Sequence, residues 1–209
     1  SFPTRRSSDL SDYVILLNND AFARPGFVRE LYNCIKEDPR IFSVSAKMLR
    51  HSQPNIIDDA GDNLTIFGWA YKIGDGQPSE AHNVKRTIFS ACAGAAIYRK
   101  EVFEEIGYFD ESFFAYIEDV DIGFRANLAG YKNVYCPSAE VEHIGSATTG
   151  SRHNTFKVKT TARNSVYLLV KNMPVVLLCL NLPFIFIGFM IKAAYFLLKG
   201  FGKAYMSGI

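Results

Sequence analysis

Three adjacent polar residues, Asn18, Asn19 and Asp20, directly follow an apolar run of strand length, Tyr13 to Leu17. Carboxylate and amide oxygens are ligands that Mg²⁺ and Mn²⁺ prefer, and either cation keeps open positions for phosphate oxygens. Asn and Asp also favour turns at strand ends, which by itself explains the motif better than a ligand does. The motif therefore indicates a metal and diphosphate site only if other groups join it.

A cluster of acidic residues, Glu118, Asp119 and Asp121, precedes Arg125 at the predicted start of a helix. A carboxylate in this position can act as a general base that takes a proton from a substrate hydroxyl group. The alternative is structural, because acidic residues in a first turn complement the helix dipole, and Asp121 with Arg125 makes an ordinary i,i+4 pair. The sequence alone leaves both interpretations open.

His143 is a candidate nitrogen ligand for the same metal, because imidazole is a common ligand of transition metals. A single histidine more often has a structural role. This residue too becomes a candidate only together with the acidic motifs.

The residues around these motifs predict alternating strands and helices. Tyr13 to Leu17 is typical of a buried parallel strand, and Phe27, Leu31 and Ile35 recur at fourfold spacing in a helix that ends before a proline. A second strand follows at Ile41 to Met48. Strand, helix and strand in this order indicate a βαβ unit, and hence an α/β fold with a mostly parallel sheet.

The same patterns assign the rest of the chain. Residues 51–83 are rich in Gly, Asp, Asn and Pro and predict an irregular excursion over the sheet, a kind of segment that often carries function. The other predicted elements are a buried strand over 87–98, helices over 100–106, 118–129 and 154–172, and a short strand over 131–136.

The ordered set of motifs resembles the rhamnosyltransferase-like branch of family 2 glycosyltransferases. The resemblance spans about Tyr13 to Lys171 and rests on LLNNDA, AGAAIYRKEVFEEIGYFDESFF, YIEDVDIGFR, EHIGSAT and ARN in that order. It implies a GT-A fold, in which a mostly parallel sheet is flanked by helices and is incomplete here. It also implies an enzyme that moves a sugar from a nucleotide-diphosphate sugar to an acceptor hydroxyl.

By this resemblance, Asn18, Asn19 and Asp20 stand where the family carries its DxD-type motif for the donor. Asp20 would hold a divalent metal, Mg²⁺ or Mn²⁺, and with it the donor diphosphate. His143 matches the late metal-binding histidine of the family. Asn18 departs from the pattern, because an amide there leaves one fewer negative charge on the cation and puts strict metal dependence in doubt.

Asp119 matches the catalytic base of the family's ED motif, and Glu118 is the second choice. The resemblance implies a single inverting displacement, in which the base deprotonates the acceptor hydroxyl while the metal stabilises the departing diphosphate. The small residues at 93 and 94 would leave room for a sugar ring, although ordinary strand packing explains them equally well. The remaining expected donor-binding residues are Ala93, Gly94, Asp121 and Arg125.

Charge is unevenly distributed along the chain. Residues 151–209 hold eight Lys/Arg and no Asp/Glu, whereas the preceding residues hold 15 and 21. The basic stretch leads into the apolar run Val175 to Ile191, which favours an anionic membrane surface over nucleic acid. The run is short for a span unless it continues past Lys192 to Leu198.

This tail, residues 173–209, predicts a location at the cytoplasmic face of the bacterial inner membrane, either peripheral or with one C-terminal span. A glycan or lipid-linked acceptor of the cell envelope fits such a location. The four widely spaced cysteines form no CxxC pair and fit a reducing compartment.

Residues 1–10, SFPTRRSSDL, match no element of this fold and resemble the translation of a sequencing-library adapter. We therefore expect a non-native leader, with a natural polar arm as the alternative. Residues 11–172 would then be the C-terminal portion of the catalytic domain. Two other functions stay open, an inactive membrane-bound remnant or scaffold, and a nucleotidyltransferase with a related fold.

Overall fold

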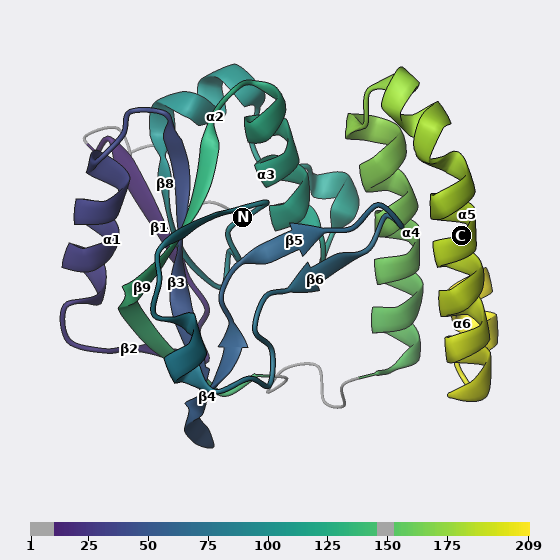
Figure 1. Ribbon diagram of the computed structural model, residues 1–209, viewed down its shortest axis with the longest axis horizontal. Helices are drawn as coiled ribbons and strands as arrows, with labels where there is room; N and C mark the ends of the chain where they lie inside the picture. Colours follow the sequence, from purple (N-terminus) through teal and green to yellow (C-terminus); the bar gives the residue numbers. More distant parts are fainter. Residues whose placement is uncertain (1–10, 146–152) are drawn as a thin grey trace.

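The computed structural model describes residues 11–145 and 153–209, so the predicted leader lies outside the described residues. The molecule is built in layers, with helix α1 on one side of a central sheet, helices α2 and α3 on the other, and the C-terminal helices beyond them (Figure 1). This arrangement confirms the predicted α/β class.

The central sheet has seven strands. Its main path runs in the order β1 (Tyr13–Leu17), β8 (Ala95–Arg99), β3 (Ile41–Arg50), β9 (Lys132–His143) and β2 (Ala21–Ala23). Off this path, β4 (Gln53–Asp59) pairs with β3, and β7 (Arg86–Ile88) pairs with β9.

The prediction of a mostly parallel sheet is wrong. Among the described strands only β3 and β9 pair in parallel, and the other pairs of the sheet are antiparallel. Strands β1 and β3 do run in the same direction, as a βαβ unit requires, but β8 lies between them and is antiparallel to both. A hydrophobic run shows that a strand is buried and gives no information about the direction of its neighbours.

Strand β1 is half-buried and lies at the end of the sheet. Tyr13 and Ile15 pack into the core beneath α1, whereas Val14 and Leu16 pack into the core on the opposite face. The expected strand is therefore present, and both of its faces are packed, but it is an edge strand among the described residues.

Helix α1 (Phe27–Lys36) packs its apolar face on the sheet through Phe27, Leu31 and Ile35, as predicted. On the opposite face, α2 (Lys100–Ile106) and α3 (Glu118–Leu128) cover a second core. Burying a Leu, Ile or Phe side chain contributes about 1.5–3 kcal/mol, so the two cores hold the helices firmly against the sheet.

Three segments differ from their predicted form. The excursion over 51–83 contains β4, a two-stranded hairpin of β5 (Asp62–Leu64) and β6 (Ala70–Lys72), and a 3-10 turn at Ser79–His82. The strand predicted over 87–98 is two strands, β7 and β8, because the backbone turns between them near Gly94. Strand β9 is longer than predicted and reaches His143.

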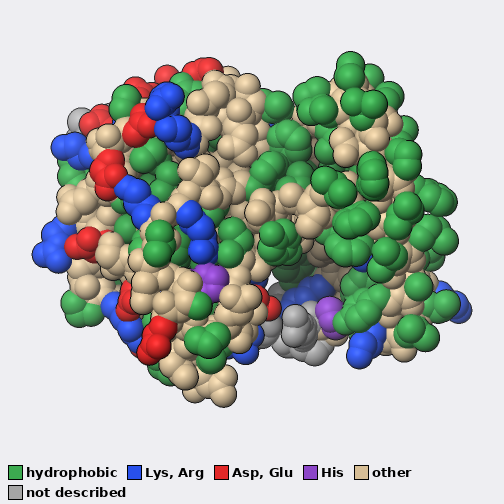
Figure 2. Space-filling model, in the orientation of Figure 1, with side chains coloured by type: hydrophobic (Ala, Val, Ile, Leu, Met, Phe, Trp, Pro, Cys, Tyr) green, Lys and Arg blue, Asp and Glu red, His purple; other side chains and the backbone are tan. Residues whose placement is uncertain are grey.

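The C-terminal residues form a helical hairpin of α4 (Thr155–Asn172) and α5 (Val175–Leu198), followed by the short α6 (Gly202–Met206). Apolar residues of α4 and α6, including Val158, Ala162 and Tyr205, pack together. Helix α5 has the length and composition of a membrane span, but Gly188 lies against Phe67 and Trp69 of the body. Its outer side chains are exposed and make the C-terminal face strongly apolar (Figure 2).

Candidate active site

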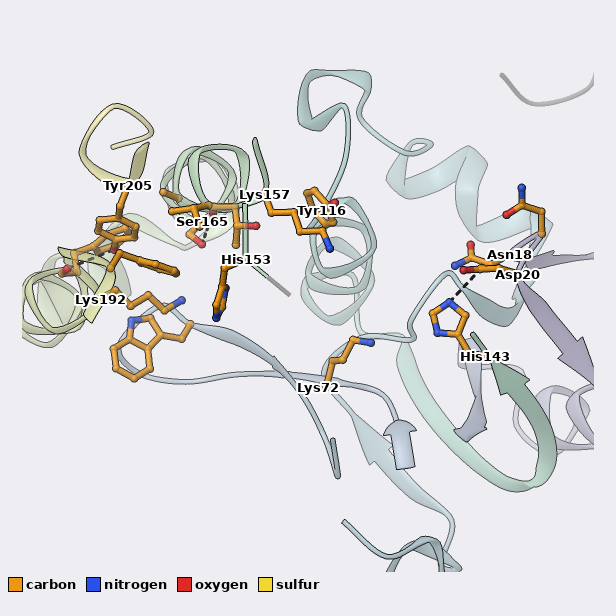
Figure 3. Close-up of a pocket in the computed structure, with 17 residues that line it drawn as sticks. Asn18, Asp20, Lys72, Tyr116, His143, His153, Lys157, Ser165, Lys192 and Tyr205 are labelled. Atoms are coloured by element: carbon orange, nitrogen blue, oxygen red, sulfur yellow. Dashed lines mark hydrogen bonds and ion pairs between the residues drawn. The ribbon is translucent and has the colours of Figure 1, made fainter. Parts of the chain in front are cut away.

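Strand pairing brings Asp20 and His143 together from distant parts of the sequence. Strands β2 and β9 are antiparallel with Ala21 opposite His143, and the Ile144 N–H donates to the Asp20 carbonyl at 3.0 Å. As a result, Nε2 of His143 lies 3.3 Å from Oδ1 of Asp20 (Figure 3). Its Nδ1 lies 2.9 Å from Oδ2 of Asp58.

This geometry suits a divalent cation. A histidine that donates its Nδ1–H to a carboxylate presents the unprotonated Nε2, and this is the usual arrangement around a metal-ligating histidine. The hydrogen bond to Asp58 raises the pKa of His143, so the ring is a more basic ligand. Asp20 and His143 therefore supply one oxygen and one nitrogen ligand, as expected from the sequence.

The motif at residues 18–20 lies next to the turn that precedes β8. The Asn18 N–H donates to the Gly94 carbonyl at 2.9 Å. A Cβ atom at Gly94 would lie 3.1 Å from Nδ2 of Asn18 and 3.3 Å from the Met48 methyl group, so a larger residue would displace them. The structure thus brings together the predicted donor-binding residues at 18–20 and 93–94.

Asp119 is held by backbone donors at the start of α3. Its Oδ2 accepts from the Ala93 N–H at 3.3 Å, and its Oδ1 accepts from the Val120 N–H at 2.9 Å. Burial raises the pKa of Asp119, which makes it a stronger base than an exposed aspartate. The neighbouring Glu118 has its pKa raised to about 7 by burial and by the Asp119 charge.

The loop before α3 is strained. Phe114, Tyr116 and Ile117 all have positive φ angles, of 61°, 67° and 72°, which cost non-glycine residues about 1–3 kcal/mol each. The buried side chain of Asn164 on α4 holds this loop. Its Nδ2 donates to three carbonyl oxygens, at 2.9, 2.9 and 2.7 Å, those of Phe113, Ala115 and Tyr116. Helix α4 therefore fixes the approach to Glu118 and Asp119.

Asp121 and Arg125 do not reach this site. Asp121 is fully buried, with Oδ2 accepting from Arg125 at 2.8 Å and Oδ1 accepting from Lys171 at 3.0 Å and from Asn172 at 2.7 Å. Arg125 also donates to the Tyr108 carbonyl at 2.8 Å. Asp121 thereby joins α3 to α4, whereas Arg125 joins α3 to the segment that follows α2.

A second group of possible ligands, Asp59, Asp62 and Cys92, lies behind the site with its atoms within 4.8 Å of one another. Burial raises the pKa of each of the three, of Asp59 to about 6. A metal ligand must be deprotonated, so this group fits a cation less well than Asp20 and His143 do.

A cleft of about 620 Å³ separates the ends of the strands from the C-terminal helices (Figures 2 and 3). Asn18, Asp20 and His143 lie at one end, and Lys192 and Tyr205 lie at the other (Figure 3). The full lining consists of Asn18, Asn19, Asp20, Trp69, Lys72, Tyr116, His143, His153, Lys157, Val158, Thr161, Ala162, Ser165, Phe189, Lys192, Phe196 and Tyr205. Asp119 and Glu118 are not among these lining residues.

Several residues of the site were not predicted. Asp58 and Lys72, whose charged groups lie 3.3 Å apart, come from the segment that was expected to be irregular. The adjacent Asp58 and Asp59 were the available signal there. Asn164 was part of the family motif ARN, but no local pattern gives its role, because its partners lie about 50 residues earlier in the chain.

The fold is that of the GT-A class of glycosyltransferases. The solved structure of GalNAc-T7 with UDP, GalNAc and Mn²⁺ superposes with a TM-score of 0.57 at 15% sequence identity. The superposition covers 76% of this chain and 31% of that chain. At this identity the likeness shows the fold alone.

Residues 13–198 match the glycosyl transferase family group 2, and the chain belongs to this family. The N-acetylglucosaminyl-diphospho-decaprenol L-rhamnosyltransferase of Mycobacterium tuberculosis is 30% identical over 158 residues, which cover 68% of this chain and 50% of that protein. The O-antigen chain rhamnosyltransferase of Salmonella anatum is 30% identical over 143 residues, which cover 68% and 44%. The chain thus spans about half the length of these relatives.

Proposed function

We propose that this chain supplies the metal-binding and base-bearing part of an inverting glycosyltransferase. Its reaction moves a sugar from a nucleotide-diphosphate sugar to an acceptor hydroxyl, in the synthesis of a cell-envelope polysaccharide or glycolipid. The observation that carries the proposal is the convergence of Asp20, His143 and Asp58 beside Asn18 and Gly94, in a chain of this family. The names of the two rhamnosyltransferase relatives support it.

Asp20 and His143 would hold a Mg²⁺ or Mn²⁺ ion, and the Asn18 amide lies on the same loop. The ion would supply positive charge that stabilises the leaving diphosphate. Asp58 orients the His143 ring through Nδ1, and Gly94 lets its backbone pack closely against Asn18 of the loop. The Mn²⁺ in the GalNAc-T7 structure supports this part of the proposal.

Asp119 is the proposed base. Its carboxylate takes the proton of the acceptor hydroxyl as the oxygen forms a bond to the anomeric carbon, while the bond from that carbon to the diphosphate breaks on the opposite side. The anomeric configuration is inverted, and no covalent enzyme intermediate forms. Because Asp119 does not line the cleft, bound substrates must open a path to it. Glu118 is the second candidate for the base.

Helix α5 is proposed to lie along the cytoplasmic membrane surface and not to cross the bilayer. Its exposed side chains are apolar, as in an interfacial helix. Crossing the bilayer would pull Gly188 away from Trp69 and remove Lys192 from the cleft. Extraction of membranes with alkaline carbonate tests this, because an interfacial protein is released and a spanning protein stays in the membrane pellet.

The activity is tested by incubating the complete gene product with labelled nucleotide sugars, Mn²⁺ and lipid extract from the source cells. We expect one sugar to be transferred, and NMR of the product to show the anomeric configuration opposite to that of the donor. A product with retained configuration, or a product carrying a transferred nucleotide, would contradict the proposal.

A further inference from the structure

The end of the cleft formed by the C-terminal helices differs chemically from the end that holds Asp20 and His143. Lys192 of α5 lines it, together with aromatic residues. Lys72, Tyr116 and Lys157 lie between the two ends (Figure 3). A single cleft therefore joins a site suited to a cation to a second site that carries positive charge.

Lys192 has no acidic neighbour among residues 11–145 and 153–209. None of the described carboxylates lies within salt-bridge distance of it, and the sequence has no Asp or Glu after Glu142. Its ammonium group lies 5.2 Å from the ring centroid of Trp69. Burial lowers the pKa of Lys192 to about 8, so the lysine is partly desolvated with no anion to compensate its charge.

The apolar part of this end continues onto the outside of the molecule. Phe189 and Phe196 of α5 line the cleft, and neighbouring residues of the same helix, such as Met190 and Leu197, are exposed. A ligand with an anionic group at Lys192 could therefore extend an attached apolar chain along α5 without entering the protein core.

We propose that the helical end of the cleft binds the phosphate of an acceptor in which that phosphate joins the sugar to an apolar chain. This inference rests on the proposed function and specifies its acceptor. Lys192 contacts the phosphate, Trp69 forms the wall beside it, and the apolar chain lies on Phe189 and Phe196. The donor diphosphate belongs to the other end, where Asp20 and His143 provide for a cation.

The single tryptophan of the chain gives a direct measurement that needs no catalysis. Trp69 lies beside Lys192, so an anion bound there changes the intrinsic fluorescence. We would titrate the protein, in a neutral glycoside detergent, with decyl diphosphate, inorganic pyrophosphate and UDP with Mn²⁺. We expect saturable quenching by decyl diphosphate, with binding at least tenfold tighter than that of pyrophosphate, because the chain adds apolar contacts.

Lys192→Gln should weaken decyl diphosphate binding about tenfold or more, because a charge-assisted hydrogen bond is lost, and Lys192→Arg should restore most of it. Lys203→Gln is the matched control, since Lys203 is an exposed lysine of α6 outside the cleft lining. Circular dichroism of each variant establishes that it is folded.

Equal binding of decyl diphosphate by Lys192→Gln and by the control would overturn the proposal. Pyrophosphate binding as tightly as decyl diphosphate would overturn the assignment of an apolar chain. Competition between UDP with Mn²⁺ and decyl diphosphate, relieved by Lys192→Gln, would assign the lysine to the donor instead. Because binding is measured without turnover, absence of sugar transfer would count against the proposed function and leave this result standing.

Discussion

The two walls of the cleft are built in opposite ways. One wall consists of strand ends, and it carries Asp20 and His143, whose positions are fixed by backbone pairing. The other wall consists of helix faces from α4, α5 and α6, and it carries lysines and aromatic rings but no carboxylate. The absence of acidic residues from 151–209 thus gives the two walls of the cleft different charges.

Under the proposed assignments, this comparison explains how one cleft would accommodate two negatively charged substrates. Carboxylates bind an anion only through an intervening cation, whereas lysines bind it directly. Residues of the first wall are fixed by strand register, which tolerates little movement. Residues of the second wall belong to the helices of the C-terminal hairpin and to α6.

The largest expected effect comes from removing the proposed base, which lies behind the first wall at the start of α3. Asp119→Asn in the complete gene product should lower the rate of sugar transfer by about 10³-fold, because the amide cannot accept the proton. Initial rates with saturating donor measure this, and Asp12→Asn, an exposed aspartate, is the control. If Glu118→Gln abolishes transfer and Asp119→Asn does not, Glu118 is the base.

A substitution at Asp121 tests whether this carboxylate has a structural role, in contrast to the proposed base Asp119 on the same helix. Asp121→Asn leaves Arg125 and Lys171 without their shared buried counter-charge, so we expect a loss of about 3 kcal/mol in the free energy of unfolding. Urea unfolding followed by circular dichroism measures it. Unchanged stability would mean that Asp121 is available for a ligand, as the sequence first indicated.

His143 tests the cation site of the first wall. His143→Ala should weaken Mn²⁺ binding about 100-fold or more, because a direct ligand is lost together with the Asp58 bond that orients it. Electron paramagnetic resonance of free Mn²⁺ gives the affinity. His51→Ala is the matched control, since His51 is exposed and pairs with Glu142. Equal affinity in the two variants would remove His143 from the site.

The smallest effect is a gain in stability at Glu118. Its Oε2 is buried without a hydrogen-bond partner among the described residues, and its folded pKa of about 7 exceeds the ordinary value of 4.5. Ionisation therefore costs folding stability as pH rises from about 4.5 to about 7. Glu118→Gln should stabilise the protein by on the order of 2 kcal/mol at pH 8 and by nearly nothing at pH 4. Thermal unfolding at both pH values checks this.

Local patterns predicted the elements better than their assembly. The predicted strand at Tyr13–Leu17 and the helix at Lys100–Ile106 are present, since their apolar spacing and terminating residues are local. The insertion of β8 between β1 and β3 was missed, because strand partners are chosen by the packing of the whole sheet. The family was predicted from ordered motifs and is confirmed.

For the candidate site too, local motifs were predicted and long-range contacts were missed. The closeness of Asp20 and His143 agrees with the roles that the resemblance implied, although the roles themselves stay predictions. Asp58, Lys72 and Asn164 were missed because each acts through partners that are distant in the sequence. The sequence spacing of Asp119 and Asp121 does not show that Asp119 accepts backbone hydrogen bonds whereas Asp121 is buried in ion pairs.

The open side of β1 has a consequence for handling the isolated chain. Within residues 11–145 and 153–209, no strand pairs with its outer edge, and Leu17 is 43% exposed. An apolar edge strand with unpaired N–H and C=O groups is a template for the addition of strands from other copies. The purified chain should therefore aggregate through β1 as its concentration rises, and Leu17→Lys, at the exposed end of the strand, would serve as a gatekeeper against it.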